Sequence, residues 1–132
     1  MSSKNTYIGD IKKLRLTGGT YDLIVRDLSD ANSSGYPWAY IDFEKREVHM
    51  HTSLDESAEL TYQVLFHELI HEILMTKGVS SYLSENNIVI EETLCDAVGF
   101  GIAEIISKNP DLIKSIQTYN SISDRKLFEG RR

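Results

Sequence analysis

The stretch Val64–Met75, VLFHELIHEILM, decides how the rest of the chain is interpreted. From Leu60 to Leu74, apolar residues recur at helical spacing and wrap most of the way round the helix, which predicts a helix over about residues 55–77. Acidic and hydroxyl residues at 52–59 are typical of a helix start, and Lys77-Gly78 is typical of a helix end. A helix that is apolar on nearly every side is expected in the middle of a domain.

Two histidines and two glutamates interrupt this apolar helix. His67 and His71 are four residues apart, so their side chains leave the same face one turn apart and can meet one metal ion. Glu68 lies about 100° round from His67, within reach of a water on that ion. This is the HExxH arrangement of two zinc ligands and a general base. Glu72 is interpreted as a solvent-facing or outer carboxylate with no part in catalysis.

A third protein ligand is expected from a second long helix over about residues 88–107. The candidates are Glu91, Glu92, Cys95 and Asp96. Glu92 is preferred, because it pairs with Asp96 at helical spacing and Asp96 can then accept a hydrogen bond from a ligating histidine. Glu91 is the rival ligand, and Cys95 fits a small buried apolar residue better than a ligand.

Small residues continue the same face of this second helix. Gly99 and Ala103 follow Asp96 at helical spacing and should let the helix approach the central one closely.

The first half of the chain predicts strands. Residues 8–16 fit a short helix or an irregular lead-in, and Tyr21–Leu28 fits a strand. Residues 29–37 form a long polar loop that is either a lid or a surface excursion. A β-hairpin is predicted from residues 38–43 and 47–52, with an apolar face that carries Val48 and Met50.

The second half predicts helices and polar segments. Residues 79–87 fit a polar connection between the two long helices. A short helix is expected at 111–119, and residues 120–132 fit a flexible tail.

Composition limits the class of protein. At 132 residues with 41% hydrophobic residues, the chain fits one α+β domain, residues 1–132. A formal net charge of −6 argues against nucleic acid and anionic membranes as partners. One cysteine, no signal peptide and no apolar span lead us to expect a cytoplasmic protein, with its oligomeric state open.

HELIH, followed after twenty intervening residues by ETLCD, resembles the HExxH…ExxxD pattern of the gluzincin metallopeptidases. The compact form is similar to the small zincin domains of phage and bacterial genomes, including the ImmA/IrrE type. The resemblance implies a minimal zincin-like fold of about three strands packed on two long helices. It also implies one Zn²⁺ held by His67, His71 and Glu92, with Glu68 as base and Asp96 as the orienting acid. The chain is too short for the second subdomain of the larger gluzincins.

The resemblance implies cleavage of peptide bonds in an intracellular protein. The alternative is a weak or inactive zincin scaffold that acts as a protein-binding module; hydrolysis of another amide, such as a cell-wall link, is a third possibility.

Other residues are secondary candidates. Tyr82 sits where some gluzincins place an oxyanion donor. His49 and His51 share the face of the hairpin strand opposite its apolar residues, and they are either simply solvated or serve as substrate or accessory metal contacts. Trp38, Tyr36 and Tyr40 could line a pocket. Part of residues 38–52 could pair with an extended substrate, as the strand nearest the cleft does in zincins.

Overall fold

The computed structural model describes residues 5–28, 38–52, 54, 57–86 and 88–118. They form an α+β fold, as predicted, in which a four-stranded sheet precedes the long helices. The strands are β1 (Lys13–Leu16), β2 (Gly19–Arg26), β3 (Ala39–Asp42) and β4 (Glu47–His51). The helices are α1 (Ala58–Thr76), α2 (Val79–Asn86) and α3 (Ile88–Lys108), and residues 110–118 are also helical.

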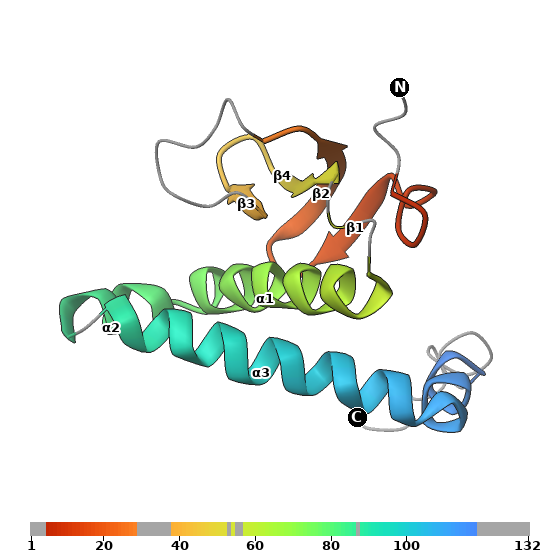
Figure 1. Ribbon diagram of the computed structural model, residues 1–132. Helices are drawn as coiled ribbons and strands as arrows, with labels where there is room; N and C mark the ends of the chain where they lie inside the picture. The colour runs from red at the N-terminus through yellow and green to blue at the C-terminus, as the bar shows by residue number, and fades with distance from the viewer. Residues whose placement is uncertain (1–4, 29–37, 53, 55–56, 87, 119–132) are drawn as a thin grey trace, which may run out of the picture.

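The elements lie in three layers, with α1 between the sheet above it and α3 below it (Figure 1). This position explains why α1 is apolar on nearly all sides, since Leu65 packs in the core under the sheet while the opposite side packs on α3. The expectation that the HExxH helix runs through the middle of the molecule is confirmed.

The sheet has the order β1-β2-β4-β3. β3 and β4 form the predicted antiparallel hairpin, and β4 pairs in parallel with β2. Val48 and Met50 point into the core, with exposed fractions of 0% and 1%. β3 is therefore the edge strand on the side of the sheet away from β1.

The prediction of a helix or irregular lead-in over residues 8–16 was wrong in its second half. Residues 13–16 alternate charged and apolar side chains, and the two leucines pack against the core while β1 pairs with β2. Asn5 holds a turn before the strand through bonds that its side chain accepts from the amides of Tyr7 and Ile8. The predicted sheet of about three strands consequently has four.

The predicted start of α1 was too early. The hydroxyl of Ser57 accepts a hydrogen bond from the amide of Leu60 at 3.1 Å, so Ser57 is the N-cap and the helix begins at Ala58. The predicted end is confirmed, because Lys77 caps the helix and Gly78 follows with a φ of 81°.

The connection between the long helices is itself helical. The segment predicted as polar coil forms α2, whose eight residues follow α1 almost directly. Its low apolar content hid the short helix, which packs on both α1 and α3. The second long helix is confirmed, with its end at Lys108.

Glu72 does not face solvent, which excludes one of the two predictions made for it. Its side chain is fully buried and accepts hydrogen bonds from the amides of Thr17 and Gly18, at 3.2 and 2.7 Å, and from the hydroxyl of Thr76 at 2.8 Å. The carboxylate therefore ties the β1–β2 turn to the last turns of α1. Burial and the neighbouring Glu72 carboxylate raise the pKa of Tyr21.

Three expectations concern residues outside the described part of the chain: a lid at 29–37, Tyr36 in a pocket and a flexible tail at 120–132. Within the described part, no helix is long and apolar enough to cross a membrane.

Candidate metal centre

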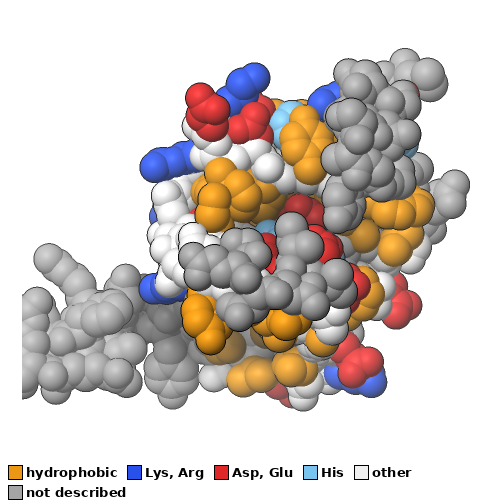
Figure 2. Space-filling model, turned by 90° about the vertical axis from the view of Figure 1, so that its left-hand side faces the viewer, with side chains coloured by type: hydrophobic (Ala, Val, Ile, Leu, Met, Phe, Trp, Pro, Cys, Tyr) orange, Lys and Arg blue, Asp and Glu red, His pale blue; other side chains and the backbone are white. Residues whose placement is uncertain are grey.

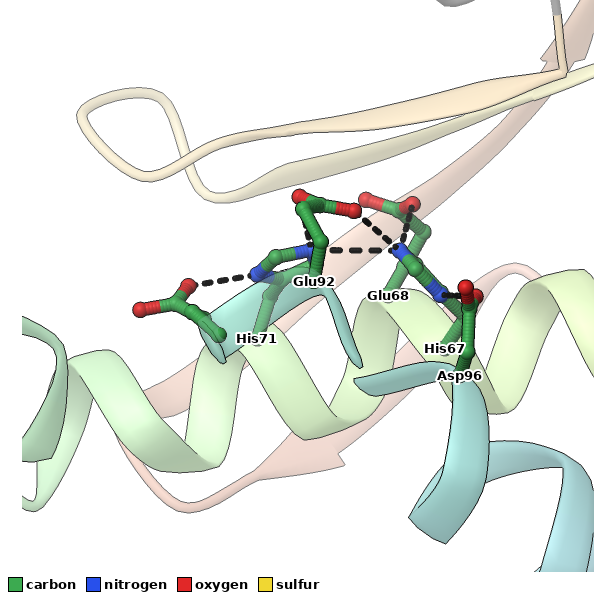
Figure 3. Close-up of polar contacts among 6 residues, drawn as sticks. His67, Glu68, His71, Glu92 and Asp96 are labelled. Atoms are coloured by element: carbon green, nitrogen blue, oxygen red, sulfur yellow. Dashed lines mark hydrogen bonds and ion pairs between the residues drawn. The ribbon is translucent and has the colours of Figure 1, made fainter. Parts of the chain in front are cut away.

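α1 brings the two predicted histidines together (Figure 3). The Nε2 atoms of His67 and His71 lie 3.2 Å apart, and the rings meet edge to face with centroids at 4.9 Å. Two imidazole nitrogens at this separation repel each other's lone pairs unless a proton or a cation lies between them. The four-residue spacing thus produces the pair of donors that it predicted.

α3 adds the carboxylate of Glu92 to this pair. One oxygen lies 3.0 Å from Nε2 of His71, and the other lies 3.2 Å from Nε2 of His67. Ligands at about 2.1 Å from a tetrahedral ion are about 3.4 Å from one another, so these separations fit donors that share one ion. His67, His71 and Glu92 are positioned to hold a metal ion.

Each histidine is fixed by a carboxylate on its other ring nitrogen. Nδ1 of His67 lies 2.6 Å from Asp96, and Nδ1 of His71 lies 2.6 Å from Glu91. A carboxylate only accepts hydrogen bonds, so each acid can accept a bond from an Nδ1–H group and leave the Nε2 of that ring as a metal donor. The two acids thus favour the tautomer that a metal site requires.

The same distances separate the roles of Glu91 and Glu92. A group made of His71, Glu91 and Cys95 also lies within ligand range. However, the 2.6 Å between Nδ1 of His71 and Oε2 of Glu91 is a hydrogen-bond length, and it is too short for two atoms that bind one ion. Burial, followed by the charge of Glu91, raises the pKa of the Cys95 thiol to about 12. Glu91 is therefore placed to orient His71, whereas the sequence alone predicted it only as a rival ligand.

Gly99 allows α3 to come this close to α1. A Cβ at Gly99 would lie 2.7 Å from the backbone nitrogen of His67 and 2.9 Å from its Cα. Only hydrogen fits there, because backbone atoms at this distance cannot move aside independently. The predicted close approach of the two helices is confirmed, with Gly99 and Ala103 both buried.

Glu68 is beside the donors and is largely buried, with 8% of its surface exposed. Its nearest carboxylate oxygen is 3.9 Å from Nε2 of His67. Burial raises the pKa of Glu68, and the two histidines oppose this rise. A carboxyl group whose pKa is raised toward neutrality can both take and return a proton.

The centre lies at the meeting point of two hollows beneath the edge strand β3. A pocket of about 320 Å³ is walled by Trp38, Leu60, Val64 and Phe100. A smaller one of about 150 Å³ is walled by Phe43 and by the first three residues of β3, Ala39, Tyr40 and Ile41. His67, Glu68, Glu92 and Ala39 line both hollows. Figure 2 shows acidic and histidine side chains within a hollow between the sheet and the helices.

The backbone of β3 presents hydrogen-bonding groups at the edge of the sheet that no other described strand pairs with. The amide of His51 donates to the carbonyl of Trp38, which makes them a hydrogen-bonded pair of the antiparallel ladder. Alternation along the ladder then turns the amide and carbonyl groups of Ala39 and Ile41 away from β4, toward the open edge.

Of the remaining candidates, Tyr82 and His51 are not among the described residues that line the hollows of the centre. Tyr82 is on α2 with 68% of its surface exposed. His51 lies 3.5 Å from Asp27. Trp38 and Tyr40 do line the hollows.

His49 is buried rather than solvated. Its ring stacks on Tyr40 at 4.5 Å, accepts a hydrogen bond from Arg26 at 3.1 Å and contacts Glu47 at 3.0 Å. Only 7% of His49 is exposed, because aromatic and guanidinium groups cover the outer face of the sheet there. The pattern of alternate residues predicted the face correctly but could not show what packs on it.

No protein-family model, curated protein or solved structure matches this chain.

Proposed function

We propose that the protein is a zinc-dependent metallopeptidase in which His67, His71 and Glu92 hold the ion. The observation that carries the proposal is the convergence of two Nε2 atoms and one carboxylate, with each histidine held by its own acid. Two imidazoles and a carboxylate form the donor set of a catalytic zinc site and leave a coordination position open. The resemblance to minimal zincins of the gluzincin type supports the same conclusion.

Zinc would supply a water of lowered pKa and polarise the scissile carbonyl. Glu68 accepts the proton of the attacking water and delivers it to the amide nitrogen as the bond breaks, since it is buried beside the donors and its pKa is raised. Asp96 and Glu91 keep the histidines in the required tautomer throughout.

The substrate is an extended peptide that lies along β3. The groups of Ala39 and Ile41 that face the open edge can pair with its backbone as an added strand. The larger hollow, with its walls of Trp38, Leu60, Val64 and Phe100, can accept an apolar side chain next to the scissile bond.

Glu68→Gln separates a peptidase from a scaffold that only binds metal or a partner. The amide keeps the size of the side chain but cannot act as a base, so zinc binding should persist while cleavage is lost. Glu59→Gln is a matched control, because Glu59 is also on α1 but is exposed and lies outside both hollows of the centre.

The assay compares zinc content and new peptide N-termini after each purified variant is incubated with a proteome. New N-termini with wild type and Glu59→Gln, but not with Glu68→Gln, would support the peptidase. Zinc binding without any cleavage would favour the scaffold, and failure to bind zinc would exclude both the centre and the mechanism.

A further inference from the structure

α3 has a second apolar face, on the side away from α1. The first face packs on α1 through Cys95, Gly99 and Ala103, which are buried. At 100° per residue, six apolar or glycine residues between Ile90 and Ile105 fall within an arc of about 100° on the opposite side, and Lys108 follows on the same arc in the last turn. We call this arc the outer face: Ile90, Leu94, Ala97, Val98, Gly101 and Ile105.

The outer face is uncovered by the described part of the chain. α3 is the outermost layer below α1 (Figure 1). The exposed fractions of Ile90, Leu94, Val98 and Ile105 are 43%, 36%, 42% and 53%. No charged residue lies on the arc between Ile90 and Ile105. A solvent-facing helix surface normally carries charged and polar residues, so this composition indicates that the face is covered by a partner.

Gly101 indicates what kind of surface covers the outer face. A Cβ at Gly101 would meet nothing within 4 Å, in contrast to the crowded Gly99. Glycine inside a helix costs about 1 kcal/mol relative to alanine, and no contact within the described chain explains it here. Ala97 lies one turn before it on the same face, so the middle of the outer face is flat and allows another helix to approach closely.

We propose that the outer face binds a second copy of this chain, with the two α3 helices antiparallel across a twofold axis. Such an interface requires one surface to complement itself. With the axis between Ala97 and Val98, Leu94 of each copy lies over Gly101 of the other. Ile90 of each copy then lies near Ile105 of the other, and Ala97 lies near Val98. Large residues thus meet small ones at the centre, and large residues meet at both ends.

The area suits a modest dimer. Half-exposed apolar side chains along four turns of α3 leave an apolar patch on the order of 400 Å² per copy. Pairing two such patches buries roughly 800 Å², which lies in the range of weak, transient interfaces. The dimer should therefore dissociate at low protein concentration.

The interface and the metal centre use opposite sides of α3. Glu92 and Asp96 face α1, so pairing through the outer face leaves both hollows open. The proposal does not depend on peptidase activity, and its test measures mass.

The test is the molar mass of the full chain, by light scattering and sedimentation, across a range of protein concentrations. We expect a reversible monomer–dimer equilibrium for wild type. Leu94→Lys and Ile105→Glu should each give a monomer with unchanged circular dichroism, because both side chains are already partly exposed. Ser107→Lys is the matched control, since it adds the same charge to α3 outside the outer face and should leave the dimer intact.

A wild-type chain that stays monomeric at every concentration would overturn the proposal. In that case, a dimer formed only by a chain truncated after Thr118 would show that the C-terminal segment covers the outer face in the full chain. A dimer that persists in Leu94→Lys and Ile105→Glu would also overturn it, since the interface would then lie elsewhere.

The register has its own test. In a Leu94→Cys, Gly101→Cys double variant, the two cysteines are two turns apart on one helix and too distant to pair within a chain. Oxidation should give a covalent dimer on a non-reducing gel. A non-covalent dimer that never cross-links would exclude the proposed alignment.

Discussion

Replacing Gly99 by alanine tests whether the close contact of α3 with α1 builds the metal centre. The new Cβ would lie 2.7 Å from the backbone nitrogen of His67, whereas ordinary contact begins at 3.4 Å, so the helices must separate by about 0.7 Å. Overpacking of this kind costs about 1–3 kcal/mol, and the better helix propensity of alanine returns up to about 1 kcal/mol. We expect a net loss of about 1–2 kcal/mol in the free energy of unfolding.

The same separation moves Glu92 and Asp96 away from the histidines. Glu92 now lies 3.0–3.2 Å from the two Nε2 atoms, and Asp96 lies 2.6 Å from Nδ1 of His67. A shift of about 0.7 Å would break the hydrogen bond to Asp96 and leave Glu92 too far to share an ion. Zinc affinity should fall at least about tenfold, the effect usual for loss of one outer partner.

Gly101→Ala is the matched control, because its Cβ would meet nothing within 4 Å. It should raise the free energy of unfolding by up to about 1 kcal/mol and leave zinc affinity unchanged. Both changes are made in the Leu94→Lys background, so that dimerisation does not contribute. Urea unfolding of the metal-free chains and zinc titration against a chromophoric chelator measure the two quantities. Equal stability and equal zinc affinity of the two variants would refute the reasoning.

Three further predictions follow from individual side chains. Glu72→Gln should lower the free energy of unfolding by about 2 kcal/mol, since an amide cannot accept all the hydrogen bonds from Thr17, Gly18 and Thr76. Urea unfolding measures this loss, and an unchanged unfolding midpoint would contradict the prediction. Asp96→Asn and Glu91→Gln should each weaken zinc binding about 10–100-fold, as measured by calorimetric zinc titration. Because Asp96 is exposed, Asp96→Asn should change the free energy of unfolding of the metal-free chain by no more than about 0.5 kcal/mol. Unchanged zinc affinity in both variants would exclude the orienting role of the two acids. Cys95 should react with a thiol reagent at pH 8 only on unfolding, because its pKa is raised to about 12 and it is fully buried; rapid labelling of the folded chain would contradict the packing of α3 on α1.

Local patterns in the sequence predicted the parts of the fold that depend on short spacings. The hairpin, the two long helices and the facing histidines each follow from alternation or from a four-residue period. The β1 strand was missed because four residues that alternate charged and apolar side chains fit several structures until β2 pairs with them. The short α2 was missed because its helix depends on packing between its neighbours and not on its own composition.

The roles of the carboxylates could not be assigned from the sequence alone. Glu68 and Glu72 each follow a histidine of the motif, yet one lies beside the metal donors and the other is tied to a turn fifty-five residues away in sequence. Similarly, Glu91 and Glu92 are adjacent on α3, and only the distances to the two nitrogens of His71 separate their roles. Tertiary contacts decide such assignments, because neighbouring positions of a helix differ by only about 100°.

The charge of the centre gives a final reason to expect a cation there. Four carboxylates, those of Glu68, Glu91, Glu92 and Asp96, lie around the two imidazoles. Among the described residues that line the two hollows, none is a lysine or an arginine. Burial raises the pKa of Glu68, and the negative charge of the neighbouring Glu92 adds to that rise. A divalent ion between the Nε2 atoms would offset this repulsion at the point where the lone pairs already converge. Metal binding should therefore raise the free energy of unfolding, and a chain whose unfolding midpoint is the same with zinc and with chelator would contradict this account of the cluster.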